Sequence, residues 1–267
     1  MKRIQLFEFE DQAWFPNWIR TSITRLIVVL NKVMGVNEVV ATLIDSILSK
    51  IETRQIVDLG SGSGGAMPAV LKDLQEKYGH QELKLILTDL YPSSENVEHF
   101  NSNLQPAISY SAKPVNAVQL NTAPEGLKTM VNCFHHMPPA SARAILKSAQ
   151  ENEQPLLIYE LSDNAMPTLI WWIFLPLSFV IMVVMVLLMT PFVRPLTFKQ
   201  VFFTYIIPII PIFYFWDGQA SMPRTYTLSD YDELLPEADS KYTWEKGYAM
   251  NAKNKKSGTY LMGMPIN

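Results

Sequence analysis

The sequence predicts an α/β fold built on a doubly wound sheet. Strand-like apolar runs alternate with helical patterns along most of the chain, and the run 56–59 leads directly into the glycines of I-V-D-L-G-S-G-S-G-G. A strand, a glycine-rich turn and a helix in this order form a nucleotide cradle, because glycines let the backbone turn sharply and bring its N–H groups close to a ligand. Two further strand-like runs, 242–250 and 259–265, flank a lysine-rich turn and predict a C-terminal antiparallel hairpin.

Asp58 favours one of the two protein classes that use such a cradle. Gly60, Gly62 and Gly65 also satisfy the dinucleotide-binding pattern G-x-G-x-x-G, which is weak evidence by itself. A NAD-binding strand has apolar residues before its first glycine, because a carboxylate would repel the pyrophosphate. Asp58 lies two residues before Gly60, so we expect a ligand with a cationic end.

The motif D-L-G-S-G-S-G, residues 58–64, resembles motif I of the class I S-adenosylmethionine-dependent methyltransferases. The resemblance implies an enzyme with S-adenosylmethionine as cofactor and a seven-stranded methyltransferase sheet that ends in an antiparallel hairpin. It covers about residues 52–163 and 217–267, and only motif I and Asp89 are specific. The cofactor contacts that it implies in the motif are Asp58, Gly60, Ser61, Gly62, Ser63 and Gly64.

Further cofactor contacts are expected after the next strands. Asp89 ends the run 83–88, about 25 residues after the glycines, where a carboxylate holds ribose hydroxyls. The family often has an acid for the adenine amine near residues 114–117, whereas this chain has Asn116, which still forms hydrogen bonds but carries no charge. The resemblance adds three neighbours to the expected cofactor site: Leu90, Ala117 and Phe134.

His135 and His136 follow the expected fourth strand, 128–134, at the carboxyl edge of the sheet where ligands bind. Many class I methyltransferases carry such a pair. A neutral histidine there can accept a proton from a hydroxyl substrate, and Glu160, which follows the fifth strand-like run, can orient a substrate or a histidine. Alternatively, the histidines only shape the cofactor pocket, and Glu160 only receives an arginine or a backbone partner.

We expect no metal site and no nucleic-acid partner. Adjacent histidines do not easily bind one ion without further ligands, and no third histidine or cysteine is near in sequence. The net charge of −3 argues against a general nucleic-acid binder. The single cysteine, Cys133, excludes an internal disulfide and fits a reducing cytoplasm, and the acids at positions 8, 10 and 11 interrupt any apolar core of an export signal.

Residues 164–193 carry no charged side chain over 30 positions, which predicts contact with a membrane. A helix over 168–190 would extend ~34 Å, enough to cross the hydrocarbon core of a bilayer. The run 200–216 is also uncharged, but Pro208 and Pro211 would bend or break a helix. We favour a spanning hairpin over a re-entrant pair, although it places Arg194 and Lys199 outside, against the positive-inside tendency. A buried helical hairpin of a soluble protein is the alternative.

The chain therefore divides into an N-terminal helical lid (1–51), a cofactor-binding core (52–163), a membrane-embedded insert (164–216) and a return to the core (217–267). The helix expected over 14–32 either lies among lipid headgroups or packs on the domain. We expect methyl transfer to a small, lipophilic or membrane-resident acceptor at the cytoplasmic face of the cell membrane. The alternatives are a non-catalytic, membrane-anchored protein that binds the cofactor, and an NAD(P)-dependent lipid reductase.

Overall fold

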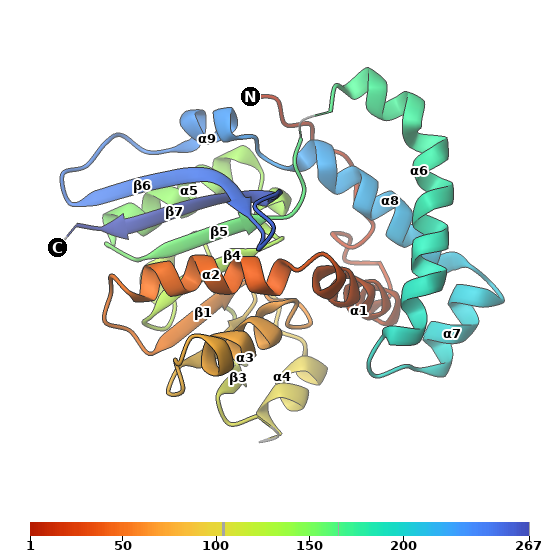
Figure 1. Cartoon of the computed structure of the whole chain (residues 1–267), viewed down its shortest axis with the longest axis horizontal. Helices are drawn as coiled ribbons and strands as arrows, with labels where there is room; N and C mark the ends of the chain where they lie inside the picture. Colours follow the sequence, from red (N-terminus) through yellow and green to blue (C-terminus); the bar gives the residue numbers. More distant parts are fainter. Residues whose placement is uncertain (103–104, 165, 267) are drawn as a thin grey trace.

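The computed structural model describes residues 1–102, 105–164 and 166–266. Residues 103–104, 165 and 267, which fall in the predicted core, insert and return, lie outside this description. Within the described residues, one seven-stranded sheet has the order β3-β2-β1-β4-β5-β7-β6 (Figure 1). The strands from β1 to β5 pair in parallel, and β7 is antiparallel to β5 and to β6. The predicted fold class and its C-terminal hairpin are confirmed. The strands are β1 (Gln55–Leu59), β2 (Lys84–Thr88), β3 (Ile108–Tyr110), β4 (Leu127–Val131), β5 (Leu156–Glu160), β6 (Tyr242–Met250) and β7 (Lys256–Pro265).

Helices cover both faces of the sheet, which is why the central strands β1, β4 and β5 are buried along nearly their whole length rather than at alternate positions. One core cluster packs α2 and α3 against the sheet, and a second packs α5 and α9 against the opposite face. Thr227 caps α9, where its hydroxyl accepts from the backbone of Asp230 and the Asp230 carboxylate accepts from the backbone of Thr227. The helices around the sheet are α2 (Val36–Leu48), α3 (Met67–Lys77), α4 (Ser94–Asn101), α5 (Pro139–Glu151) and α9 (Leu228–Leu234).

The apolar insert leaves the sheet after β5 and forms three α-helices: α6 (Thr168–Met189), α7 (Phe198–Tyr205) and α8 (Ile209–Arg224). The stretch Thr168–Phe192 is long and apolar enough to cross a membrane, whereas α7 and α8 are bent by 82° at the break before Pro208. The second apolar run is therefore bent, as predicted, at Pro208, whereas Pro211 is accommodated in the first turn of α8. Because α8 continues to Arg224, the boundary expected at residue 216 falls inside a helix.

The first helix, α1 (Asn17–Val33), packs its buried face against the insert. Ile19, Ile23 and Leu26 are buried in one cluster with Val186 of α6 and Ile210 of α8. The insert, α1 and the residues before α1 thus share a third core at the side of the sheet domain (Figure 1).

The chain before α1 runs along α8 and across the carboxyl edge of the sheet. The backbone N–H of Ile4 donates to the carbonyl of Pro223 at 2.8 Å, and the N–H of Phe9 donates to Asp217 Oδ1 at 2.8 Å. We call residues 1–16 the N-terminal segment. Its path brings residues near the start of the chain to the edge of the sheet that carries the histidines.

Candidate functional site

The glycine loop after β1 adopts backbone conformations that require glycine. Gly60, Gly62, Gly64 and Gly65 have φ values of 69°, 51°, 95° and 51°. At Gly64 a Cβ atom would also lie 2.6 Å from Cζ of Phe100, so a side chain has no room there. The loop therefore exposes its backbone where β1 ends and α3 begins, which is the geometry of the predicted cradle.

Asp89 lies at the end of β2 and faces this loop. Its Oδ2 accepts from the N–H of Gly62 at 3.0 Å and its Oδ1 accepts from the N–H of Tyr91 at 2.9 Å. The neighbouring Leu90 is exposed, and the N–H of Val115 donates to the carbonyl of Asp89 at 2.9 Å. The structure thus brings the glycine loop, Asp89 and the chain after β3 together, as the sequence predicted.

Asp58 lies beneath the loop rather than facing a ligand. Its carboxylate is only 4% exposed and accepts from the Ser61 hydroxyl at 2.6 Å and the Thr129 hydroxyl at 2.8 Å. Burial raises the pKa of Asp58 to about 7, although both hydrogen bonds favour the ionised form. Asp58 and Ser61 thus hold the loop in shape, and a direct contact of Asp58 with a cationic ligand stays a prediction. Ser63 remains half-buried within the loop.

Of the other expected cofactor contacts, Asn116 and Ala117 are accessible, whereas Phe134 is buried. Asn116 and Ala117 are partly exposed, and Asn116 Oδ1 accepts from the N–H of Val118 at 3.0 Å, so part of its amide stabilises its own turn. Phe134 is fully buried, with its ring 5.5 Å from that of Tyr226, because β4 ends at Val131 and the chain turns inward there. The side chain of Phe134 therefore belongs to the core and faces no open site.

Of the partners that the sequence left open for Glu160, the structure shows a histidine side chain and a backbone N–H, both from His135. Glu160 Oε1 accepts from the backbone N–H of His135 at 2.9 Å, and Glu160 Oε2 lies 2.8 Å from His135 Nδ1. When Nδ1 carries the proton of this hydrogen bond, Nε2 has a free lone pair. His135 is 6% exposed, and Arg3 of the N-terminal segment donates to its carbonyl at 2.8 Å.

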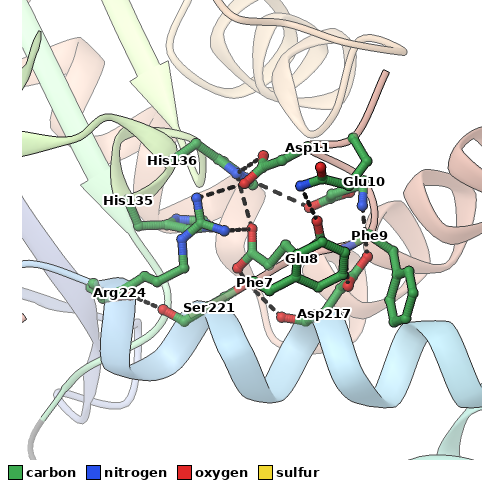
Figure 2. A network of polar contacts seen from close by, with 12 residues as sticks. Phe7, Glu8, Phe9, Glu10, Asp11, His135, His136, Asp217, Ser221 and Arg224 are labelled. Carbon is green, nitrogen blue, oxygen red and sulfur yellow. Dashed lines mark hydrogen bonds and ion pairs between the residues drawn. The ribbon is translucent and has the colours of Figure 1, made fainter. Parts of the chain in front are cut away.

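His136 lies among carboxylates of the N-terminal segment (Figure 2). Its Nδ1 is 2.9 Å from Asp11 Oδ1 and 3.1 Å from Glu8 Oε2, and its Nε2 is 3.6 Å from Glu10 Oε1. Burial alone would lower the pKa of His136, but the bonds to Asp11 and Glu8 outweigh it and raise that pKa well above its usual value. Despite partial burial, the pKa of Asp11 is lowered to about 2 by His136 and Arg224.

Arg224, the last residue of α8, completes this network. Its guanidinium lies 2.5 Å from Glu8 Oε2 and 2.7 Å from Asp11 Oδ2, and both Arg224 and Glu8 are fully buried. These partners were not predicted because they lie far from the histidines along the chain: 125 residues separate Asp11 from His136, and 88 separate Arg224 from it (224 − 136). The available signal was the run E-F-E-D at residues 8–11, which places three acids within a segment rich in aromatics.

Comparison with known proteins places the fold. No protein-family model matches the chain, and no curated protein matches it either. Among solved structures, the plantazolicin methyltransferase BpumL in complex with SAH is 11% identical, with 94% of this chain and 98% of that chain covered and a TM-score of 0.50. The methyltransferase domain of bacterial CtHen1 is 13% identical, with 86% and 99% covered and a TM-score of 0.48. TnmH is 14% identical, with 88% and 55% covered and a TM-score of 0.48.

The strand order and the similarity to BpumL agree. The sheet ends in an antiparallel hairpin, and the similarity to BpumL extends over 94% of this chain. The chain therefore has the fold of the class I S-adenosylmethionine-dependent methyltransferases.

Proposed function

We propose that this protein is a methyltransferase that uses S-adenosylmethionine. The observation that carries the proposal is the sheet order β3-β2-β1-β4-β5-β7-β6 together with the glycine loop at the end of β1. A dinucleotide-binding Rossmann sheet lacks the antiparallel β7, so the topology favours S-adenosylmethionine over NAD(P). BpumL, which has this fold, was solved with SAH, the product that remains after S-adenosylmethionine has lost its methyl group.

In this proposal the cofactor lies over the carboxyl ends of β1 and β2. Asp89 accepts hydrogen bonds from the two ribose hydroxyls, and the backbone of Gly60, Gly62 and Gly64 faces the amino-acid part. The adenine lies beside Leu90, Asn116 and Ala117, while Asp58, Ser61 and Phe134 support these contacts from below. The exposed positive-φ backbone of the loop and the position of Asp89 opposite it support this arrangement.

The acceptor lies over β4 and β5, next to His135, His136 and Glu160. Bond formation is an attack by an acceptor atom on the sulfonium methyl, and positioning of the two reactants supplies most of the rate. In the simplest form of this proposal, His135 Nε2 takes the proton of an acceptor hydroxyl. The Glu160 carboxylate then balances the positive charge on the imidazole and holds the orientation of its ring. The 2.8 Å contact between Glu160 and His135 Nδ1 supports these roles.

The proposed acceptor is lipophilic and reaches the site from the membrane. The insert begins a few residues after Glu160, at the same edge of the sheet as the histidines. Apolar side chains along α6 are exposed, including Leu169 (72%) and Leu188 (67%), and water is a poor solvent for such a surface. Together, these features support attachment to the cytoplasmic face of the cell membrane through α6.

The experiment that tests the cofactor is calorimetry on the detergent-solubilised protein. Asp89→Ala should weaken S-adenosylmethionine binding by roughly 1.5–3 kcal/mol for each charge-assisted hydrogen bond lost, that is, at least about tenfold. Asp73→Ala changes an acid on the outer face of α3, where it pairs with Lys77, and serves as the matched control with unchanged affinity. Equal affinity of wild type and Asp89→Ala would remove this role from Asp89.

Two competing functions make different predictions in companion measurements. For a lipid reductase, NAD(P) rather than S-adenosylmethionine would raise the melting temperature. A ligand present at 100 times its Kd adds ~2.7 kcal/mol to the free energy of unfolding. For a non-catalytic binding protein, S-adenosylmethionine would bind without turnover. A methyltransferase instead yields lipid extracts that contain a species heavier by one methylene only when the gene is present.

A further inference from the structure

Three potential metal ligands from two distant parts of the chain converge at the acceptor edge. Glu8, His135 and His136 each offer one ligand atom, and these atoms lie within 4.8 Å of one another (Figure 2). Glu8 is fully buried and His135 nearly so. We propose that these three side chains bind one divalent transition-metal ion.

The orientation of His135 suits a metal ligand. Its Nδ1 is held by Glu160 at 2.8 Å, and its backbone N–H donates to the same carboxylate at 2.9 Å. A carboxylate behind the imidazole is the usual support of a metal-bound histidine, because it fixes the tautomer and turns the other nitrogen toward the ion. Glu160 therefore leaves Nε2 of His135 as the ligand atom.

Glu8 offers a carboxylate oxygen in the same position. Ser221 donates to Glu8 Oε1 at 2.8 Å, whereas the buried Oε2 lies 2.5 Å from the Arg224 guanidinium and 3.1 Å from His136 Nδ1. Two imidazole nitrogens and one carboxylate oxygen are a ligand set that suits zinc, cobalt or iron rather than magnesium or calcium. A fourth position remains for water or for an acceptor oxygen.

The net charge of the groups around the cluster also favours a bound cation. With both imidazoles neutral, the guanidinium groups of the network compensate only half of its carboxylates, and two negative charges remain for a divalent ion to neutralise. The ion would replace the proton shared by His136 and its acidic neighbours, while Arg224 keeps its second contact, to Asp11 at 2.7 Å. The charged groups counted here are Glu8, Glu10, Asp11, Glu160, Arg3 and Arg224.

The catalytic role of the ion rests on the proposed function, whereas its binding does not. A hydroxyl of the acceptor that occupies the fourth position would lose its proton to solvent, because a bound divalent ion lowers the pKa of an oxygen ligand. That oxygen then forms the new bond to the methyl carbon, the bond from sulfur to the methyl breaks, and the sulfonium becomes the neutral thioether of SAH. The ion, rather than the bare imidazole of His135, would then activate the acceptor.

The test is titration of the full chain, purified without a histidine tag and treated with a chelator, with Co²⁺ as the probe. We expect one Co²⁺ per chain and visible absorption bands of an ion with nitrogen ligands. Glu8→Gln should lower the affinity for Co²⁺ at least tenfold, and Glu160→Gln should lower it about 10–100-fold through the support of His135. The matched control is His80→Ala, because His80 pairs with Asp45 at 2.7 Å outside this cluster, and its affinity should equal that of the wild type.

His136→Gln provides a second ligand variant should Glu8→Gln fail to fold, because the His136 side chain is 20% exposed and its loss disturbs packing less. Wild-type protein that binds no Co²⁺, or ligand variants that bind it as tightly as wild type, would overturn the proposal. S-adenosylmethionine affinity is measured on the same metal-free samples. Cofactor binding without Co²⁺ binding rejects the metal site alone, and Co²⁺ binding without cofactor binding rejects the proposed function alone.

Discussion

At the scale of single residues, Asp58 belongs to the motif that predicted the fold, and its carboxylate supports the glycine loop. The acid is buried below the glycine loop, where two hydroxyls hold its carboxylate. Its pKa is raised to about 7, above the ordinary value of an aspartate, because burial disfavours the ionised form. Protonation is therefore favoured by folding, and the stability that this gives is complete below the unfolded-state pKa and is lost as the pH rises through about 7.

This linkage predicts the behaviour of Asp58→Asn, which keeps the shape of the side chain but does not ionise. Relative to wild type, the cofactor-free variant should gain about 2–3 kcal/mol of stability between pH 5 and pH 8, because the folded carboxyl stays protonated up to about pH 7 while the unfolded one is ionised. Denaturant unfolding of both proteins at the two pH values measures this difference. A difference in stability that stays constant with pH would mean that Asp58 is already ionised at pH 5 in the folded protein.

At the scale of elements, α6 exposes a large apolar surface. Trp171, Val186 and Met189 are buried against the protein, whereas most of the remaining apolar side chains of this helix are exposed. Leu177 lies in the exposed part, with 54% of its surface accessible. If α6 is inserted in hydrocarbon, a charge there costs about 2.5–3.5 kcal/mol near the middle of the bilayer.

Leu177→Glu should therefore shift the protein from liposomes toward the supernatant, whereas wild type remains bound through high-salt and carbonate washes because salt screens only surface electrostatics. Tyr91→Glu places the same charge on an exposed aromatic position of the sheet domain, at 84% exposure, and should not change the partition. Equal release of both variants would mean that α6 lies outside the bilayer.

At the scale of the whole molecule, α1 joins the insert to the sheet domain. Its apolar face packs on α6 and α8, and its polar end reaches the carboxyl edge of the sheet, where the Asn132 side chain donates to Asn31 at 3.4 Å. The insert and the sheet domain are therefore expected to unfold together. Replacement of the whole insert by a flexible linker would also uncover Ile19, Ile23 and Leu26, so a smaller change is the better probe.

Ile23→Ala should lower the stability of the protein in detergent by about 2–5 kcal/mol, because Ile23 is 1% exposed within the cluster that α1 shares with the insert. Val33→Ala, on the same helix at 73% exposure, should change it by less than about 0.5 kcal/mol. Tryptophan fluorescence and retention of S-adenosylmethionine binding follow the insert and the sheet domain separately. Two separate transitions would show that α1 does not couple them.

The sequence predicted the sheet, the glycine loop, the position of Asp89 and the placement of His135 and Glu160 at one edge, because each depends on local pattern and on the shared edge of parallel strands. It extended the fourth strand to Phe134, whereas β4 ends at Val131 and the chain turns at Asn132, with φ of 55°. It did not reveal Glu8, Asp11 or Arg224 as partners of His136, since long-range ion pairs leave no periodic signal in a single sequence. The same reason hid the packing of α1 on the insert.

The path of the N-terminal segment has a consequence for the order in which the protein matures. Ile4 and Phe9 leave the ribosome before their hydrogen-bond partners, Pro223 and Asp217, which are synthesised more than 200 residues later. The N-terminal segment therefore cannot dock on α8 until the sheet domain and the insert have emerged. At an emergence rate of about 5–20 residues per second, this interval lasts on the order of ten seconds or more. The edge around His135 would stay open during that interval, which gives a newly made chain time to take up a ligand before the segment docks over it.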